Sequence, residues 1–267
     1  MTIFQYDFMV RAFITGILLA VIVPCIGVVI VLKRLSMIGD ALSHTSLAGV
    51  ALGLIFGFNP ILGAICACAL ASFAIEGIRK KIPKYSEMSI AIIMSAGVGL
   101  AGVLSGFVQS SQSFDSFLFG SIVAISNFEM ALVILVGIAV ILGFILLYKE
   151  LFYISFDEQA AKLAGVPVRL VNFIFTLLTA ATVSVAARTV GSLIVSSLMV
   201  VPVACAMQFA KSYKQTVILS SLFGLIFTVV GLFVSFYAGL KPGGTIVLAG
   251  VLALLLILLM KRLFRRA

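Results

Sequence analysis

The chain is poor in charged residues, which make up only 10% of its 267 positions, and it contains a single histidine. Soluble domains carry about 25% charged residues and about half apolar ones. Here 63% of the residues are hydrophobic, and the mean hydropathy is +1.31. A water-soluble fold of this size could not bury so much apolar surface, so the excess must face lipid. The composition therefore predicts a polytopic membrane protein.

Several motifs that would indicate an enzyme are missing. The sequence has no Gly-rich phosphate loop of the Walker type, no His-Glu-x-x-His motif and no paired-aspartate site, so we expect a non-enzymatic chain. The four cysteines lie in apolar runs without the spacing of a structural zinc site or a disulfide framework. Cys66 and Cys68 resemble a soft ligand pair, but residues two apart point to different sides of a helix, which favours packing.

Long apolar runs predict an all-helical protein whose residues 1–267 form one transmembrane domain. Each membrane-spanning helix needs about 20 mostly apolar residues. Very short connections leave open that two neighbouring segments are half-helices, so we expect eight or nine spans. The candidates are 10–32, 36–58, 60–80, 87–109, 127–148, 168–187, 191–210, 214–236 and 243–261. The first is expected to be a true span, because it is too long for a cleavable signal.

The basic residues predict the orientation of these spans, because cytoplasmic loops are enriched in Lys and Arg. With the N-terminus outside, only Arg11, Arg188 and Lys241 of the 18 basic residues fall on the outer side. The C-terminus is then cytoplasmic. The net charge of +9 is explained as a topology signal beside anionic lipid, and nucleic-acid binding is not expected. The cytoplasmic set is Lys33, Arg34, Arg79, Lys80, Lys81, Lys84, Lys149, Lys162, Arg169, Lys211, Lys214, Lys261, Arg262, Arg265 and Arg266.

Glycines repeat every fourth residue in two of the predicted spans. Gly49, Gly53 and Gly57 do so in the second span, and Gly102 and Gly106 in the fourth. Small residues at this spacing let helix backbones approach closely in lipid. The pattern predicts helix packing, with the second span buried among its neighbours.

One ionisable pair is expected inside a span. Most acids fall near span ends or in loops, whereas Asp40 is followed four residues later by His44. Such a pair stacks on one helix face about 6 Å apart. A carboxylate with an imidazole suits zinc, manganese or ferrous iron better than calcium or magnesium. Alternatively, Asp40 caps the helix or pairs with Arg34, and His44 only hydrogen-bonds a neighbouring helix.

A second informative segment is the loop 155–167, which is too polar to enter lipid. Ser155 and Asp157 provide a helix N-cap signal, Gly165 a C-cap signal, and Pro167 opens the next span. A short stiff helix of this kind is typical of a docking element for a soluble partner, although a capped connector fits equally well. The apolar stretch 113–122 is too short to span and is expected at the extracellular interface.

Four stretches together resemble the permeases of the ABC-3 family of zinc, manganese and iron importers. They are LKRLSMIGDALSH at 32–44 with SLAGVALG at 46–53, FGSI at 119–122, the loop from FDE at 156–158 to GVPV at 165–168, and VGSLIV at 190–195 with PVA at 202–204. The resemblance covers essentially the whole chain in order. Its details look most like zinc permeases of Gram-positive bacteria.

The resemblance implies a bacterial cell-membrane permease with an architecture similar to the cobalamin-type (type II) importers. It implies a second copy of the chain, a separate cytoplasmic ATPase dimer and an extracytoplasmic metal-binding protein as partners. Asp40 and His44 match the family residues proposed to line the ion path. The transported ion is expected to be zinc, with manganese or iron as alternatives, and no permanently bound cofactor is expected. The coupling segment, which seats in the ATPase, corresponds to Asp157, Glu158, Ala161, Leu163 and Gly165.

From another class, a gradient-driven secondary metal transporter remains open. Such transporters usually carry intramembrane acids on several helices, whereas only one predicted span offers a candidate here. Association with an ATPase would distinguish the two classes.

Overall fold

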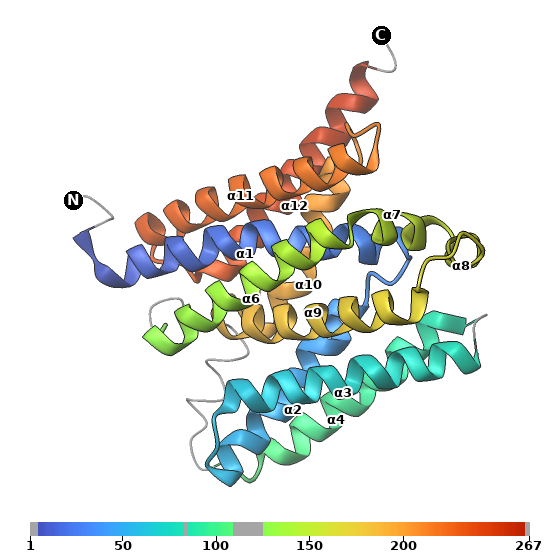
Figure 1. Ribbon diagram of the computed structural model, residues 1–267. Coiled ribbons are helices and arrows are strands. Elements are labelled where there is room, and N and C mark those ends of the chain that lie inside the picture. Colours follow the sequence, from blue (N-terminus) through green and yellow to red (C-terminus); the bar gives the residue numbers. More distant parts are fainter. Residues whose placement is uncertain (1–4, 83–84, 109–124, 265–267) are drawn as a thin grey trace.

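The computed structural model describes residues 5–82, 85–108 and 125–264, and every regular element within these ranges is a helix (Figure 1). The expected interfacial stretch 113–122 and the motif at 119–122 lie outside the described residues. The longer helices are α1 (Asp7–Leu32), α2 (Ile38–Phe56), α3 (Pro60–Lys81), α4 (Ser86–Ser105), α6 (Asn127–Leu146), α9 (Val168–Thr189), α10 (Ser192–Ala206), α11 (Tyr213–Ala238) and α12 (Pro242–Phe264). Two short helices, α7 (Tyr148–Phe156) and α8 (Glu158–Leu163), connect α6 to α9.

Local sequence signals set several helix ends. Pro60 opens α3, and the side chain of Asn59 accepts a hydrogen bond from the Ile61 N–H at 2.9 Å. Ser126 and Glu129 form a reciprocal capping box at the start of α6. Gly57 ends α2 at a φ of +71°, a left-handed conformation that glycine adopts without steric cost.

Each of the nine expected segments overlaps a helix, but only eight described helices are long and apolar enough to cross a membrane. The exception is α10, which corresponds to the expected span 191–210. It has 15 residues, and at 1.5 Å per residue it is about 22 Å long, shorter than the roughly 30 Å hydrocarbon core. The described residues therefore contain eight candidate spans, within the expected eight or nine, and the segment 191–210 is the one that is not a full-length span. Hydropathy continues past Ala206, where the helix stops, so composition alone misplaced this end.

The centre of the bundle is formed by α1, α2 and α9. Buried residues make up 67% of the most apolar stretch of α1 and 61% of those of α2 and α9, against 22% for α4 and α12. In Figure 1, α11 and α12 lie above α1, whereas α2, α3 and α4 form a group below α9. The predicted burial of the second span is thus found, and the outer faces of α4 and α12 are left for lipid or a partner.

Close backbone contact between α2 and α3 occurs at Gly49. A Cβ atom added there would lie 2.3 Å from the carbonyl oxygen of Gly63, and one at Gly53 would lie 2.7 Å from the Cα atom of Pro60. The predicted packing role therefore holds for these two glycines. It is wrong for Gly57, which caps the helix, and at Gly102 an added Cβ would meet nothing within 4 Å.

The predicted loops gather at two ends of the bundle. At the end that carries α8, contacts join segments far apart in the sequence. The joined pairs are Lys33 with Asn172, Arg79 with Glu158, Tyr148 with Tyr213, and Lys261 with Gln208. At the other end, Arg11 donates to the Ile125 carbonyl at 3.3 Å, and Arg188 pairs with Glu129. Lys33, Arg79 and Lys261 thus lie at one end of the bundle, and Arg11 and Arg188 lie at the other. The orientation prediction assigns these two groups to opposite membrane faces.

Candidate metal-transit site and coupling segment

Asp40 lies in the first turn of α2, directly after a tight linker of five residues, 33–37, that follows α1. The Leu35 N–H donates to the Ile30 carbonyl at 2.9 Å, and the Ile38 N–H donates to the Leu35 carbonyl at the same distance. Arg34 has a φ of +58°, a left-handed conformation that is uncommon for a residue with a side chain. The linker therefore turns the chain sharply and fixes where α2 begins.

The Asp40 carboxylate contacts α10. Its Oδ1 accepts a hydrogen bond from the Ser196 hydroxyl at 2.8 Å, and both residues are half-buried. Asp40 makes no side-chain cap bond to α2, and no ion pair joins it to Arg34. Neither alternative that the sequence left open for Asp40 is therefore found. The carboxylate is oriented by a neighbouring helix.

His44 lies one turn further along the same face of α2 and is also half-buried. No hydrogen bond of its imidazole to another described residue is found, and its ring nitrogens are not among the buried polar atoms without a partner. A ring nitrogen with some solvent access and no protein partner is available to a ligand. The two side chains thus offer an oxygen and a nitrogen donor within one helical turn.

The part of the chain that the structure describes does not supply a complete metal cage here. Within the described ranges, no group of three or more His, Cys, Asp or Glu side chains is close enough to hold a metal ion. The four cysteines are free, and Cys68 donates its S–H to the Leu42 carbonyl at 3.1 Å, whereas Cys66 is exposed. The two cysteines point to different sides of α3, as predicted. Asp40 and His44 therefore offer two donors, fewer than a complete metal cage needs.

Two acidic residues, Glu129 and Glu76, form partly buried ion pairs near helix ends. The Arg188 Nε atom lies 2.7 Å from Glu129 Oε1, and the two side chains are only 16% and 10% exposed. Glu76 lies in α3, with one carboxylate oxygen 2.7 Å from the Arg79 guanidinium. The pair between α6 and α9 was missed because its partners are 59 positions apart. Their only signal in the sequence is that charged residues are rare within apolar segments.

The predicted docking element is a helix of six residues, α8, at one end of the bundle (Figure 1). Asp157 caps it, with Oδ1 accepting from the N–H groups of Gln159 and Ala160 at 2.8 and 3.0 Å. Gly165 follows with a φ of +84°, the predicted left-handed C-terminal residue. Ser155, expected to share the cap, instead lies in α7 and donates to the Leu151 carbonyl.

The surface of α8 is unusual for a connector. Only Ala161 is buried, at 1% exposure, and it anchors the helix to the bundle. Leu163 is 90% exposed, and Phe156, just before the helix, is 64% exposed. Exposed large apolar side chains on a polar segment are typical of a protein-interaction surface.

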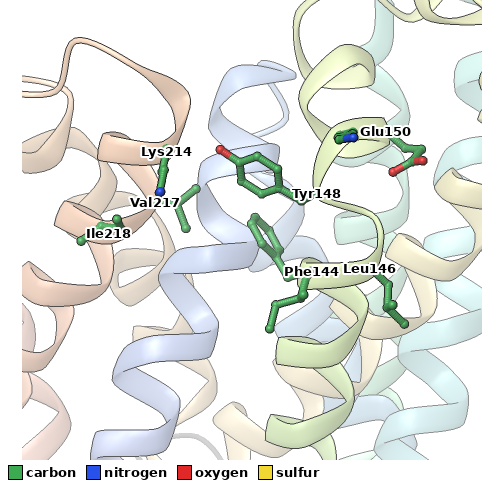
Figure 2. A pocket seen from close by; sticks show the side chains of 9 residues that line it. Phe144, Leu146, Tyr148, Glu150, Lys214, Val217 and Ile218 are labelled. Carbon is green, nitrogen blue, oxygen red and sulfur yellow. The ribbon is translucent and has the colours of Figure 1, made fainter.

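A groove of about 760 Å³ lies between α6, α7 and α11 (Figure 2). Figure 2 shows Phe144, Leu146 and Tyr148 on one side, and Lys214, Val217 and Ile218 on the other. No residue of α2 or α10 lines it. The groove is therefore not part of the candidate metal site.

Comparison with known proteins gives matches along nearly the whole chain. A "probable metal transport system membrane protein" from Treponema pallidum is 34% identical over 98% of both chains. The "manganese import system permease protein ScaB" of Streptococcus gordonii is 34% identical over 94% of this chain and 90% of that protein. Among solved structures, PsaBC from Streptococcus pneumoniae in complex with Fab matches with a TM-score of 0.86 and 32% identity, covering 96% of this chain and 92% of that one.

A more distant structure, an inward-facing putative metal-chelate type ABC transporter, matches with a TM-score of 0.71 at 17% identity, which shows a common fold. It covers 94% of this chain and 86% of that one. The predicted all-helical ABC permease architecture is thereby confirmed. Residues 5–261 also match the family model of the ABC 3 transport family. The chain therefore belongs to the ABC 3 transport family.

Proposed function

We propose that this chain is the membrane-spanning subunit of an ATP-driven importer of a divalent transition-metal ion. The observation that carries the proposal is the Asp40–His44 pair, placed one turn apart on a central helix of an ABC 3 family permease. The chain acts as a passage rather than as an enzyme. ATP hydrolysis would take place in a separate partner.

Manganese is the better supported cargo. Permeases from three Streptococcus species and two Listeria species that are 31–34% identical to this chain are named for manganese import or transport. The sequence analysis preferred zinc because of details around His44 and the coupling loop. Those details do not outweigh the names of the relatives, so zinc becomes the second choice.

The open donor set supports transit rather than storage. An ion in a permeation path must be bound well enough to enter and weakly enough to leave. Asp40 Oδ1 and a ring nitrogen of His44 would replace part of the hydration shell of the ion, while Ser196 holds the carboxylate in place. Rocking of helices would then expose the pair to each side of the membrane in turn.

The coupling segment supports an ATPase partner. The capped helix α8 displays the exposed Leu163 side chain, which a groove on a partner protein could bind. Asp157, Glu158, Ala161 and Gly165 belong to that helix and its two ends. A second copy of the chain and an extracytoplasmic metal-binding protein complete the proposed assembly.

The orientation follows from charge. The bundle end that carries α8 also collects Lys33, Arg79 and Lys261, so the positive-inside rule makes it cytoplasmic. The beginning of α1 is then outside and the end of α12 inside. The protein would reside in a bacterial cell membrane.

Uptake of radioactive manganese and zinc by the reconstituted complex, with and without ATP, tests the proposal. Asp40→Ala with His44→Ala should abolish ATP-dependent uptake of both ions while the complex stays assembled. Glu87→Gln removes one exposed carboxylate from α4 and serves as the control, with uptake unchanged. Wild-type uptake by the double variant would refute the role of the pair. Uptake that proceeds without an ATPase would instead support the gradient-driven class.

A further inference from the structure

A chain of polar contacts joins α8 to the linker before α2. Glu158, the first residue of α8, accepts a hydrogen bond at Oε1 from the Asn172 side-chain amide at 3.3 Å. Its other oxygen, Oε2, lies 3.5 Å from the Arg79 guanidinium of α3. The short helix is thus held by side chains from two different spans, besides the buried Ala161.

Asn172 sits in the middle of this chain. It is 6% exposed, and its Oδ1 accepts a hydrogen bond from Lys33 Nζ at 2.8 Å. An amide offers a donor at one end and an acceptor at the other, so Asn172 connects an acidic partner to a basic one. Because buried polar groups are costly when unpaired, loss of either neighbour would disturb the other.

The pKa of the Lys33 ammonium depends on these neighbouring side chains. Burial, followed by the nearby Arg79, lowers its pKa from 10.5 to about 8, whereas Glu158 and Glu76 act in the opposite direction. The Nζ atom also lies 5.9 Å from the centre of the Phe175 ring. Removal of Glu158 would therefore weaken the electrostatic support of the Lys33 ammonium.

The position of Lys33 bears directly on the candidate metal site. Lys33 opens the linker 33–37, and Asp40 follows in the first turn of α2. Lys33, Leu35, Ile38 and Asn172 line one small cavity of about 30 Å³. The linker thus meets α9 at this small cavity, and the Lys33–Asn172 hydrogen bond ties the linker to that helix.

We propose that Glu158, Asn172 and Lys33 form a relay that transmits movement of the coupling helix α8 to the start of α2 and so to Asp40. The three act as positioning residues and contact neither ATP nor the ion. When the ATPase displaces α8, Glu158 moves with it, Asn172 loses its acceptor, and the Lys33 linker is released. The inference rests on the proposed function and adds how hydrolysis and ion passage are linked.

The test measures ATP hydrolysis and metal uptake together, in the purified complex reconstituted into liposomes, with manganese as the probe. Asn172→Leu breaks the relay at its centre without touching the partner. We expect hydrolysis to continue and the ATP consumed per ion to rise at least about fivefold, the lower end of typical coupling effects. Thr176→Val, one turn further on α9 in the same cavity lining, is the control and should keep the wild-type ratio.

Two variants of Glu158 separate the relay from a simple docking role. Glu158→Gln keeps an oxygen acceptor for Asn172 and should retain most of the coupling, whereas Glu158→Leu should raise the ratio as Asn172→Leu does. The Glu158 side chain is 42% exposed, so these variants carry the test if Asn172→Leu does not assemble. A wild-type ratio in Glu158→Leu, or equal losses in Gln and Leu, would overturn the relay. Absence of uptake by the wild-type complex would instead count against the proposed function.

Discussion

The buried ion pair between Glu129 and Arg188 allows a quantitative prediction about the end of the bundle opposite α8. In Arg188→Met, the Glu129 carboxylate keeps the Ser126 N–H, which donates to Oε2 at 2.7 Å, but loses the Nε contact at 2.7 Å. Breaking a buried pair by removing one partner costs about 3–5 kcal/mol. Since one charge-assisted hydrogen bond survives, we expect the lower end, about 3 kcal/mol.

The double variant Arg188→Met with Glu129→Gln separates the charge from the packing. Glutamine retains an oxygen that accepts the Ser126 N–H, so the capping box survives without a buried charge. Replacement of both members of a buried pair is often close to neutral. We therefore expect the double variant to recover all but about 1 kcal/mol of the loss.

The loss of stability is measured by heating the purified protein in detergent and recording the fraction that remains monodisperse at each temperature. For chains of this size, about 2–4 °C of Tm corresponds to 1 kcal/mol, so the single variant should lose about 6–12 °C. The double variant should lose less than about 4 °C. A single variant within about 2 °C of wild type, or a double variant that falls as far as the single one, would refute the reasoning.

Four further predictions follow from individual contacts. Gly49→Ala should destabilise the chain by about 1–3 kcal/mol or more, because its Cβ would meet the α3 backbone, whereas Gly102→Ala should be neutral in the same unfolding assay. Ser196→Ala should weaken manganese binding about 10–100-fold by freeing the Asp40 carboxylate, as equilibrium dialysis would detect. Leu163→Asp should abolish co-purification of the ATPase without changing thermal stability, since that side chain is 90% exposed. The Lys33 ammonium should lose its proton near pH 8, well below an ordinary lysine, in NMR titration of methylated lysines, with Lys33→Arg identifying the signal.

Much of the fold could be read from the sequence because lipid imposes simple rules. Apolar length located every long helix, and the Asn59-Pro60 turn and the Gly165 C-cap followed from local backbone preferences. The early stop of α10 could not be predicted in the same way. Three of the four residues that follow Ala206 are apolar (Met207, Phe209 and Ala210), so composition did not mark where the helix ends.

The site was predictable in part for the same reason. Asp40 and His44 stand out because they are i, i+4 neighbours on one helix. Ser196 did not stand out, because it lies 156 positions away and serine is common in membrane helices. The Glu158–Asn172 contact and the Glu129–Arg188 pair were hidden likewise, since each joins residues that are close only after the helices pack.

The donor atoms of Asp40 and His44 do not distinguish manganese from zinc. Carboxylate oxygen and imidazole nitrogen serve both ions, which differ in coordination number and geometry more than in these two ligands. Within the described part of the chain, the pair and the Ser196 hydroxyl do not complete either a tetrahedral or an octahedral shell. Water or further groups are needed to complete either shell. Closure by a second Asp–His pair would favour tetrahedral zinc, whereas completion by water would favour octahedral manganese. If the proposed site is correct, the choice between the two metals depends on the groups that complete it and not on Asp40 and His44 alone.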